Sequence, residues 1–302
     1  MYASFLDELS AFLDSSAVQC NADMSQYTSF KAGGRADILL HISEAQTLQR
    51  TVCLLKKHAL KYMVIGNGTN LLVKDTGYGG VLIRFFHGSF APVVSGTTLH
   101  AHAGMLLSAL SQSAAEQGLS GLEFLSGIPG TVGGAVYMNA GAYGGEIKDV
   151  LTQVHALTAD GTMTILPADQ LEFAYRSSAF HHNGAVILNA DFHATYAPPA
   201  SIYAKMSSIN AKRREKQPLE YPSAGSTFKR PVGYYAGQLI EQCGLKGRGV
   251  GGAKVSEKHA GFIINYNHAT AQDIIDTIDM VRRTVQDAFG ITLETEVQIL
   301  GT

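Results

Sequence analysis

The stretch GLEFLSGIPGTVGGAVYMNAGAYGGE, residues 121–146, decides how this sequence is interpreted, because glycine recurs through it in an apolar setting. A backbone without side chains can approach a flat, extended ligand closely. A glycine-rich packed turn is the alternative, and the density of glycine favours the ligand. The residues on which this interpretation rests are Gly127, Gly130, Gly133, Gly134, Gly141, Gly144 and Gly145, with Pro129, Asn139 and Tyr143 among them.

A second loop, GNGTNLLV (66–73), follows a predicted strand (37–42), helix (44–60) and short strand (61–66). Glycine and asparagine tolerate positive φ, and consecutive N–H groups in such a loop can form a nest for an anion. The loop matches neither the Walker A nor the GxGxxG pattern, and taken alone it is typical of an ordinary turn. Two glycine loops on separate subdomains nevertheless suit a dinucleotide whose pyrophosphate lies between them.

Composition narrows the class of protein. The 302 residues are 46% hydrophobic, enough for a large core and more typical of two or three domains than of one. The formal net charge is −2, from 23 basic and 25 acidic residues, so no global field favours nucleic acid or an anionic membrane as a partner.

The cysteines and the N-terminus indicate the compartment. Cys20, Cys53 and Cys243 are far apart and form no CxxC or Cys/His spacing, so neither a disulfide framework nor a zinc site is expected. The His100-x-His102 pair has no third ligand at sensible spacing, and we expect no metal. The N-terminal residues have helical rather than signal-peptide character, and no apolar run reaches membrane-spanning length. These features predict a cytoplasmic protein.

The remaining segments give a coarse order of elements. Short strands are expected over 79–104, a helix over 105–117, and further strands between about 150 and 196. Pro198 and Pro199 mark a predicted boundary, and a helix with a basic end follows over 201–217.

The C-terminal region predicts a capped helix and a strand. Thr270 and Asp273 have the spacing of a capping box, and Gly290 ends the helix. Its apolar face is expected to contain Ile274, Ile275, Ile278, Val281, Val285 and Phe289. The last strand, ITLETEVQIL (291–300), is expected to place Ile291, Leu293, Val297 and Ile299 on one face and Glu294 and Glu296 on the other.

The segment PSAGSTFKRP (222–231) contains a serine, Ser226, between Gly225 and Thr227. A hydrolase nucleophile would have glycine two residues before and two residues after the serine, at a strand-to-helix turn, and that pattern is missing. Composition alone is typical of a turn serine. Its role therefore depends on what the rest of the chain binds.

Several motifs in one order resemble those of the UDP-N-acetylenolpyruvoylglucosamine reductase family. They are GNGTNLLV, SGIPGTVGGAVYMNAGAYGGE, YRSS (175–178), PSAGSTFKRP, KVSEKHAGFIIN (254–265) and LETEV (293–297). The resemblance implies an α+β fold: a two-subdomain FAD-binding module of the vanillyl-alcohol-oxidase/PCMH type plus a C-terminal α+β substrate-binding domain. The implied limits are 1–83 for the first subdomain, joined by the strand 291–302, then 84–199 for the second and 200–290 for the substrate-binding domain.

The same resemblance implies that the glycine loops hold FAD non-covalently. The implied cofactor-binding residues are Gly66, Asn67, Gly68, Thr69, Asn70, Leu71, Ser126, Gly127, Ile128, Pro129, Gly130, Thr131, Gly133, Gly134, Asn139, Gly141, Ala142 and Tyr143.

The family's reaction implies roles for three residues. NADPH reduces FAD, and a hydride then reaches the methylene carbon of an enolpyruvyl ether on a UDP-sugar. Arg176 suits the substrate carboxylate because a guanidinium binds it bidentately. Ser226 would give a proton to C2, and a protonated Glu296 would hydrogen-bond the enolate. The product is UDP-N-acetylmuramate, a peptidoglycan precursor.

Further residues are implied for the UDP-sugar substrate, namely Tyr175, Lys212, Lys229, Arg230 and His259. In the basic run KRREK, Arg213 and Arg214 are further candidates for the substrate diphosphate, but the leading interpretation of Arg213 and Lys216 is a solvated helix end. The chain resembles the shorter subtype of the family, because no room for an inserted tyrosine loop separates the YRSS motif from the serine motif.

Two alternatives stay open. An FAD-dependent alcohol or sugar oxidase could share this fold, although an oxidase needs no proton donor to an enolate. A flavin- or nucleotide-binding protein without turnover is the other, and the presence of Arg176, Ser226 and Glu296 together argues against it.

Overall fold

The computed structural model describes residues 2–86 and 91–301. Their contacts divide into two compact units. Unit 1 comprises Leu39–Asn67 and Leu82–Arg213, with the N-terminal residues up to Gln19. Unit 2 comprises Cys20–Ile38, Gly68–Val81 and the residues from Arg214 onward. The chain therefore crosses between the units several times, and the three-part division expected from the sequence stays a prediction.

Both units mix helices and strands, which confirms the α+β class. The N-terminal elements are α1 (Ala3–Ser10), β1 (Val18–Asp23), β2 (Arg35–Ile42), α2 (Ala45–Lys57), β3 (Tyr62–Ile65), β4 (Leu71–Val73) and β5 (Tyr78–Phe85). One sheet has the order β1-β2-β5-β3, and the limits of the units fall within β1, β2 and β5.

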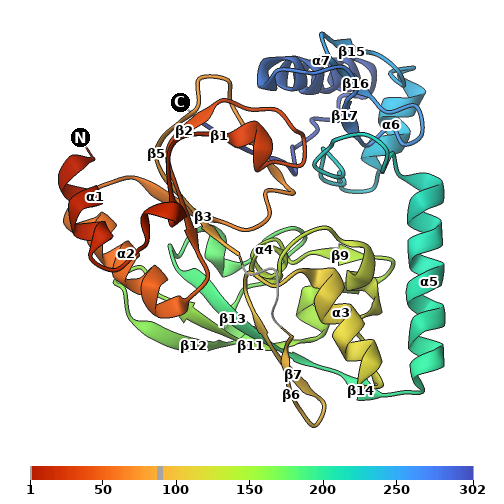
Figure 1. The fold of residues 1–302 in the computed structure, drawn as a ribbon. Helices are drawn as coiled ribbons and strands as arrows, with labels where there is room; N and C mark the ends of the chain where they lie inside the picture. Colours follow the sequence, from red (N-terminus) through yellow and green to blue (C-terminus); the bar gives the residue numbers. More distant parts are fainter. Residues whose placement is uncertain (1, 87–90, 302) are drawn as a thin grey trace. The chain divides into compact units, whose positions relative to one another are not determined.

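Unit 1 is built on a five-stranded antiparallel sheet with the order β12-β11-β13-β7-β6 (Figure 1). Its strands are β6 (Val93–Ser95), β7 (Thr98–His102), β11 (Leu151–Leu157), β12 (Met163–Pro167) and β13 (Val186–His193). The helix α4 (Val132–Tyr137) packs on β13 and β7, and Leu99, Ala190 and Phe192 are fully buried in this layer. The second glycine loop thus leads into a helix that lies against a sheet.

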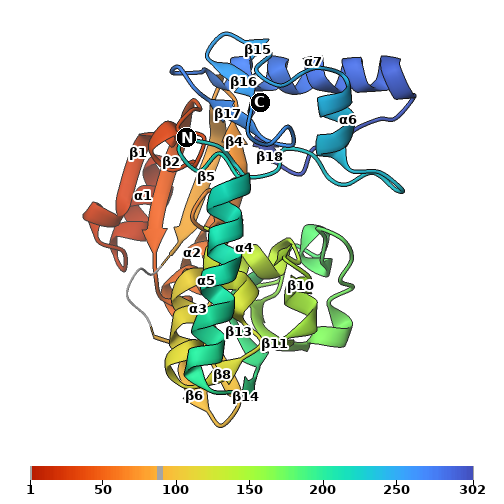
Figure 2. The ribbon, with the colours of Figure 1, turned by 90° about the vertical axis from the view of Figure 1, so that its right-hand side faces the viewer.

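The helix α5 (Pro199–Lys216) begins at the predicted proline boundary and continues from unit 1 into unit 2. Its first turns lie along α3 (Leu107–Glu116), as Figure 2 shows. Ile202 and Met206 pack there against Ala115. A buried carboxylate strengthens the attachment, because Glu123 binds Lys205 Nζ at 3.1 Å.

Unit 2 has one core around α6 (Ala236–Gln242), α7 (Ala271–Phe289) and the small sheet β15-β16-β17. Those strands are Gly249–Val250, Ala253–Val255 and Ile263–Asn265. The capping box predicted for α7 is confirmed: Thr270 Oγ1 accepts the Asp273 N–H, and Asp273 accepts the Thr270 N–H. Gly290 ends the helix at a φ of 70°, as expected of a C-terminal glycine.

Three details of this region differ from the expectation. Phe289 is 41% exposed, so the buried face of α7 ends at Val285. The last strand is short, since only β18 (Gln298–Leu300) pairs, in parallel with β4. A bend at Val297 shifts the alternation, so that Leu300 is buried and Ile299 is exposed. Pairing with β4 decides this register, and the residues of the strand do not contain that information.

The small elements include short strands and turns: β8 (Leu119–Ser120), β9 (Gly141–Ala142), β10 (Gly145–Glu146) and β14 (Thr195–Tyr196). The chain runs from β13 through β14 directly into α5. No helix within 2–86 or 91–301 has both the length and the apolar character needed to cross a membrane.

Candidate cofactor and substrate sites

The first two residues of the first glycine loop, 66–67, meet the second loop within unit 1. A Cβ placed on Gly66 would lie 2.3 Å from Thr131 Oγ1. Asn67 donates from Nδ2 to the Pro129 carbonyl at 3.4 Å, and its Oδ1 accepts from Arg84 at 3.2 Å. Residues 66–67 and 129–131 are therefore held against each other, as a single binding site for one ligand would require.

Most of the glycines in these loops have a structural reason of their own. Cβ atoms on Gly127, Gly133, Gly141 and Gly145 would all lie within 3.0 Å of protein atoms. The absence of their side chains follows from the packing of the chain, and so these glycines do not by themselves indicate a ligand.

Two positions in the second loop do have room. A Cβ on Gly134 would have only Thr131 Oγ1 near it, at 3.4 Å, and a Cβ on Gly144 would meet nothing within 4 Å. Ser126 Oγ is buried, and in the described part of the chain it has no hydrogen-bond partner. Space beside the backbone and an unsatisfied buried hydroxyl both fit a polar cofactor such as FAD along 126–134.

Arg176 lies at the tip of a tight hairpin in unit 1. Ala174 and Ser177 exchange backbone hydrogen bonds of 3.1 and 3.2 Å, which leaves Tyr175 and Arg176 as the turn. The guanidinium donates to the carbonyls of Asn139 (3.5 Å) and Gly141 (3.2 Å). These carbonyl acceptors orient the guanidinium toward the second glycine loop.

Asn139 holds that arrangement together. Its side chain is completely buried and donates to the Ala174 carbonyl at 3.0 Å and to Glu146 Oε2 at 3.2 Å. Its Oδ1 accepts the Lys148 N–H at 3.1 Å. The residue expected to bind the cofactor therefore uses its side chain to join the glycine loop to the Arg176 hairpin.

Backbone strain gathers in the same place. Asn139, Tyr143 and Arg176 have positive φ angles of 41°, 51° and 54°. Each such residue costs on the order of 1–3 kcal/mol and persists only where the surroundings impose it. Strain of this kind is common at ligand-binding sites.

Ser226 and Glu296 come together in unit 2. The Glu296 N–H donates to the Thr227 carbonyl at 2.8 Å, and the Lys229 N–H donates to the Glu294 carbonyl at 2.9 Å. Phe228 and Thr295 form an isolated bridge between them. The serine segment and the LETEV segment therefore run side by side, and Ser226 itself is exposed.

Thr227 attaches the serine segment to residues 261–263 of unit 2. It is fully buried, its N–H donates to the Gly261 carbonyl at 2.8 Å, and its Oγ1 accepts the Ile263 N–H at 3.0 Å. Gly225, with a φ of 79°, makes the turn that precedes Ser226. The serine thus stands on a fixed backbone with its hydroxyl at the surface of the unit.

Asn70 has a role that the sequence did not reveal. Its Nδ2 donates to the Glu296 carbonyl at 3.1 Å, and its own carbonyl accepts the Gln298 N–H at 2.9 Å. The end of the first glycine loop therefore positions Glu296. No signal in the sequence links two residues so far apart.

His259 also lies in unit 2, beside the turn that anchors Thr227. Its Nδ1 accepts the Gly261 N–H at 3.1 Å, which leaves Nε2 as the protonated nitrogen. Burial lowers the pKa of His259 by more than its hydrogen bond to the backbone raises it. His259 is therefore a neutral hydrogen-bond donor over the physiological pH range.

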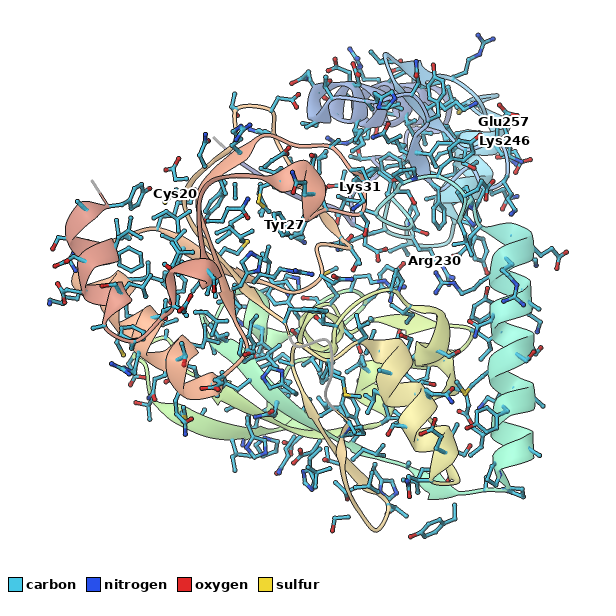
Figure 3. All side chains as sticks on the ribbon, in the orientation of Figure 1. Cys20, Tyr27, Lys31, Arg230, Lys246 and Glu257 are labelled. Carbon is cyan, nitrogen blue, oxygen red and sulfur yellow. The ribbon has the colours of Figure 1, made fainter. Side chains whose placement is uncertain are left out.

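The basic candidates lie in different surroundings. Lys212 and Arg230 are exposed, and the Arg230 guanidinium lies over the Tyr235 ring at 4.6 Å; Figure 3 labels Arg230. Lys229 pairs with Glu294 at 3.5 Å. Tyr175 is 44% exposed at the hairpin tip.

The interpretation of Arg213 as part of a solvated helix end is wrong. Its side chain lies against the backbone of Gly127, and burial lowers its pKa. Lys216 is exposed, as expected. Arg213 and Lys216 differ in exposure because α5 passes the second glycine loop at Arg213, and the sequence of the basic run does not show this.

Comparison with known proteins places this arrangement in a class. The FAD binding domain family matches residues 36–166, and the C-terminal domain family of UDP-N-acetylenolpyruvoylglucosamine reductase matches residues 217–300. A grass-pollen glucose dehydrogenase, Phl p 4, has the same fold over 65% of this chain, at a TM-score of 0.51 and 14% identity. The chain is an FAD-dependent oxidoreductase.

Relatives of nearly equal length identify the family. The UDP-N-acetylenolpyruvoylglucosamine reductase of Lachnoclostridium phytofermentans is 45% identical over 98% of this chain and 97% of its own. That of Latilactobacillus sakei is 45% identical over 98% of both chains. The crystal structure of the Thermus caldophilus reductase covers 93% of this chain and 98% of its own, with a TM-score of 0.80 and 36% identity. The chain belongs to the UDP-N-acetylenolpyruvoylglucosamine reductase family.

Proposed function

We propose that the chain reduces UDP-N-acetylglucosamine enolpyruvate to UDP-N-acetylmuramate, with NADPH as the hydride donor, and so supplies a peptidoglycan precursor. The observation that carries this proposal is the pairing of the serine segment with the LETEV segment, through the hydrogen bond from the Glu296 N–H to the Thr227 carbonyl. It brings the backbone that carries Ser226 beside the backbone that carries Glu296. The names of the near-full-length relatives supply the substrate.

FAD, held non-covalently along the two glycine loops, would supply the redox chemistry by passing a hydride from NADPH to the methylene carbon of the enolpyruvyl group. Ser126, Asn67 and the backbone around Gly134 are the groups of unit 1 that we assign to holding it. Negative charge then develops at C2 of the substrate and spreads into the carboxylate as an enolate.

Arg176 would bind the substrate carboxylate. Its guanidinium is already oriented by the carbonyls of Asn139 and Gly141, so little side-chain freedom remains to be lost. Because a guanidinium stays protonated and donates two parallel hydrogen bonds, it would stabilise the enolate, which carries the additional negative charge, more than the singly charged carboxylate of the ground state.

Ser226 would donate the proton to C2, and protonated Glu296 would hydrogen-bond an enolate oxygen. A serine hydroxyl is a weak acid, but a carbanionic carbon is a strong base and accepts its proton. The anchoring of Thr227 fixes the backbone on which Ser226 stands, so the hydroxyl can be aimed without help from its own side-chain partners. His259, Tyr175, Lys212, Lys229 and Arg230 are proposed to contact the UDP-sugar.

The test is the visible spectrum of the purified protein under anaerobic conditions. We expect a yellow protein that bleaches with NADPH and recovers its colour with UDP-N-acetylglucosamine enolpyruvate. Recovery with oxygen alone would contradict the proposed substrate and favour a sugar or alcohol oxidase. Bleaching by NADH in place of NADPH would contradict the proposed hydride donor.

A further inference from the structure

Arg213 lies along the backbone of the second glycine loop. If Gly127 carried a Cβ, that atom would be 2.6 Å from Arg213 Cδ, 3.1 Å from its Nη1 and 2.7 Å from Asn210 Oδ1. Its neighbours on α5, Lys212 and Arg214, are exposed. Arg213 therefore differs from the rest of the basic run in pointing its guanidinium toward residues 126–127.

In the part of the chain that the structure describes, the Arg213 guanidinium has no hydrogen-bond or ion-pair partner, although Tyr143 of the same glycine loop interacts with it electrostatically. No hydrogen bond or ion pair joins its guanidinium to residues 2–86 or 91–301, although burial lowers its pKa. A guanidinium stays protonated in proteins, and a desolvated cation normally has an anionic or hydrogen-bonding partner. The buried Ser126 Oγ, one residue from Gly127, also has none among those residues. A cation and a hydroxyl that both need a partner thus lie at the same loop.

We propose that Arg213 binds the diphosphate of FAD and that Ser126 Oγ donates a second hydrogen bond to it. This inference rests on the proposed placement of FAD along the second glycine loop. The diphosphate is the only anionic group of FAD, and the planar fork of an arginine matches two phosphate oxygens. Arg213 lies outside both family matches, 36–166 and 217–300, while the loop it contacts lies inside the FAD-binding match.

The UDP-sugar substrate also carries a diphosphate, and the position of Arg213 favours FAD. Arg213, Asn210, Ser126 and Gly127 all belong to unit 1, together with Asn67 and the backbone around Gly134. The experiment separates the two ligands by titrating each of them.

The test measures cofactor affinity of the full chain after FAD has been removed, by quenching of flavin fluorescence. We expect Arg213→Gln to weaken FAD binding about 10–100-fold, the loss of one charged hydrogen-bonded contact. Riboflavin, which lacks the diphosphate, should bind the variant and the parent protein within about twofold of each other. Arg213→Lys keeps the positive charge but lacks the planar fork, so its FAD affinity should lie between those of the parent protein and Arg213→Gln. Lys216→Gln, on the exposed side of the same helix, is the matched control and should change nothing.

Each other outcome overturns the inference. Equal losses for FAD and riboflavin would mean that Arg213 only maintains the loop. Normal FAD affinity with weaker binding of UDP to the FAD-loaded protein would assign Arg213 to the substrate. If Arg213→Gln does not fold, as judged by circular dichroism, Arg213→Lys gives the answer: FAD and riboflavin losses that are equal contradict the proposal.

Gly134→Ala shows whether a negative result concerns Arg213 alone or the proposed placement of FAD along the second glycine loop. Alanine should stabilise α4, because glycine is a poor helix former, but its methyl group takes up room beside the loop. Weaker FAD binding in Gly134→Ala with normal binding in Arg213→Gln would reject Arg213 alone. Normal binding in both variants would reject the placement of the cofactor and the inference together.

Discussion

The Arg176 hairpin and the Ser226 segment position their proposed catalytic side chains by different means. Arg176 depends on a buried side chain, Asn139, and on residues with positive φ. Ser226 depends on backbone hydrogen bonds from Thr227 to Gly261 and from Glu296 to Thr227. In the first region a single residue, Asn139, supplies both the buried side chain that holds the local structure and a backbone carbonyl that orients the functional group. In the second, the local structure does not depend on the functional side chain, and so loss of function and loss of stability should separate.

The largest effect is expected for Ser226→Ala. Since the exposed hydroxyl takes no part in anchoring the segment, the free energy of unfolding should be unchanged within about 0.5 kcal/mol. Reduction of the flavin by NADPH should be normal, while its reoxidation by the enolpyruvyl substrate should slow about 10²–10⁴-fold, the range of general acid catalysis. Stopped-flow flavin absorbance measures both steps. Ser223→Ala in the same loop is the control, and normal reoxidation in Ser226→Ala would refute the proton-donor role.

In the Arg176 region, Asn139→Ala should lower both the stability of the protein and its activity. It removes three hydrogen bonds from a buried site and leaves the Lys148 N–H and the Ala174 carbonyl without their partner, which we expect to cost about 2–4 kcal/mol. Urea denaturation measures the cost, and reoxidation of the flavin should slow as well, because the Asn139 backbone also orients Arg176. Asn183→Ala, in an exposed turn, is the control. Full stability in Asn139→Ala would contradict the contrast drawn between the regions.

Thr227→Val tests the hydrogen bond that attaches the serine segment to Ile263. Valine keeps the shape of threonine but leaves the buried Ile263 N–H without an acceptor, so a loss of about 1–3 kcal/mol in the free energy of unfolding is expected. Thermal or urea unfolding measures it, with Thr292→Val on the exposed surface as the control. A loss below about 0.5 kcal/mol would show that the backbone hydrogen bonds alone hold this segment.

The smallest expected effect is a dependence of the unfolding free energy on pH, caused by Glu123 in unit 1. Burial alone raises the pKa of Glu123, but hydrogen bonds from Ser120, Lys205 and the Gly121 N–H outweigh it and leave the pKa below its usual value. The ionised carboxylate therefore stabilises the fold above its unfolded pKa of about 4.3, and this contribution is lost as pH falls through the folded pKa. The difference in unfolding free energy between the parent protein and Glu123→Gln should shrink between about pH 5 and 3. A constant difference would mean that Glu123 acts through packing.

Much of the fold and of the candidate site could be predicted from short stretches of sequence. The α7 helix, its capping box and its terminal glycine depend on residues within one element, so their spacing is visible in the chain. The glycine loops, the YRSS motif and the serine segment are likewise contiguous, and together they indicated the family and the FAD cofactor that the comparisons then showed.

Contacts across long stretches of chain were decided by the tertiary structure alone. Asn70 reaches Glu296 across 226 residues, and Arg213 is half-buried because α5 passes the backbone of Gly127. The pairing of β18 with β4 set the register that buries Leu300 and exposes Ile299. Local propensity and periodicity act over a few residues, whereas burial and hydrogen bonding depend on which distant segments the folded chain brings together.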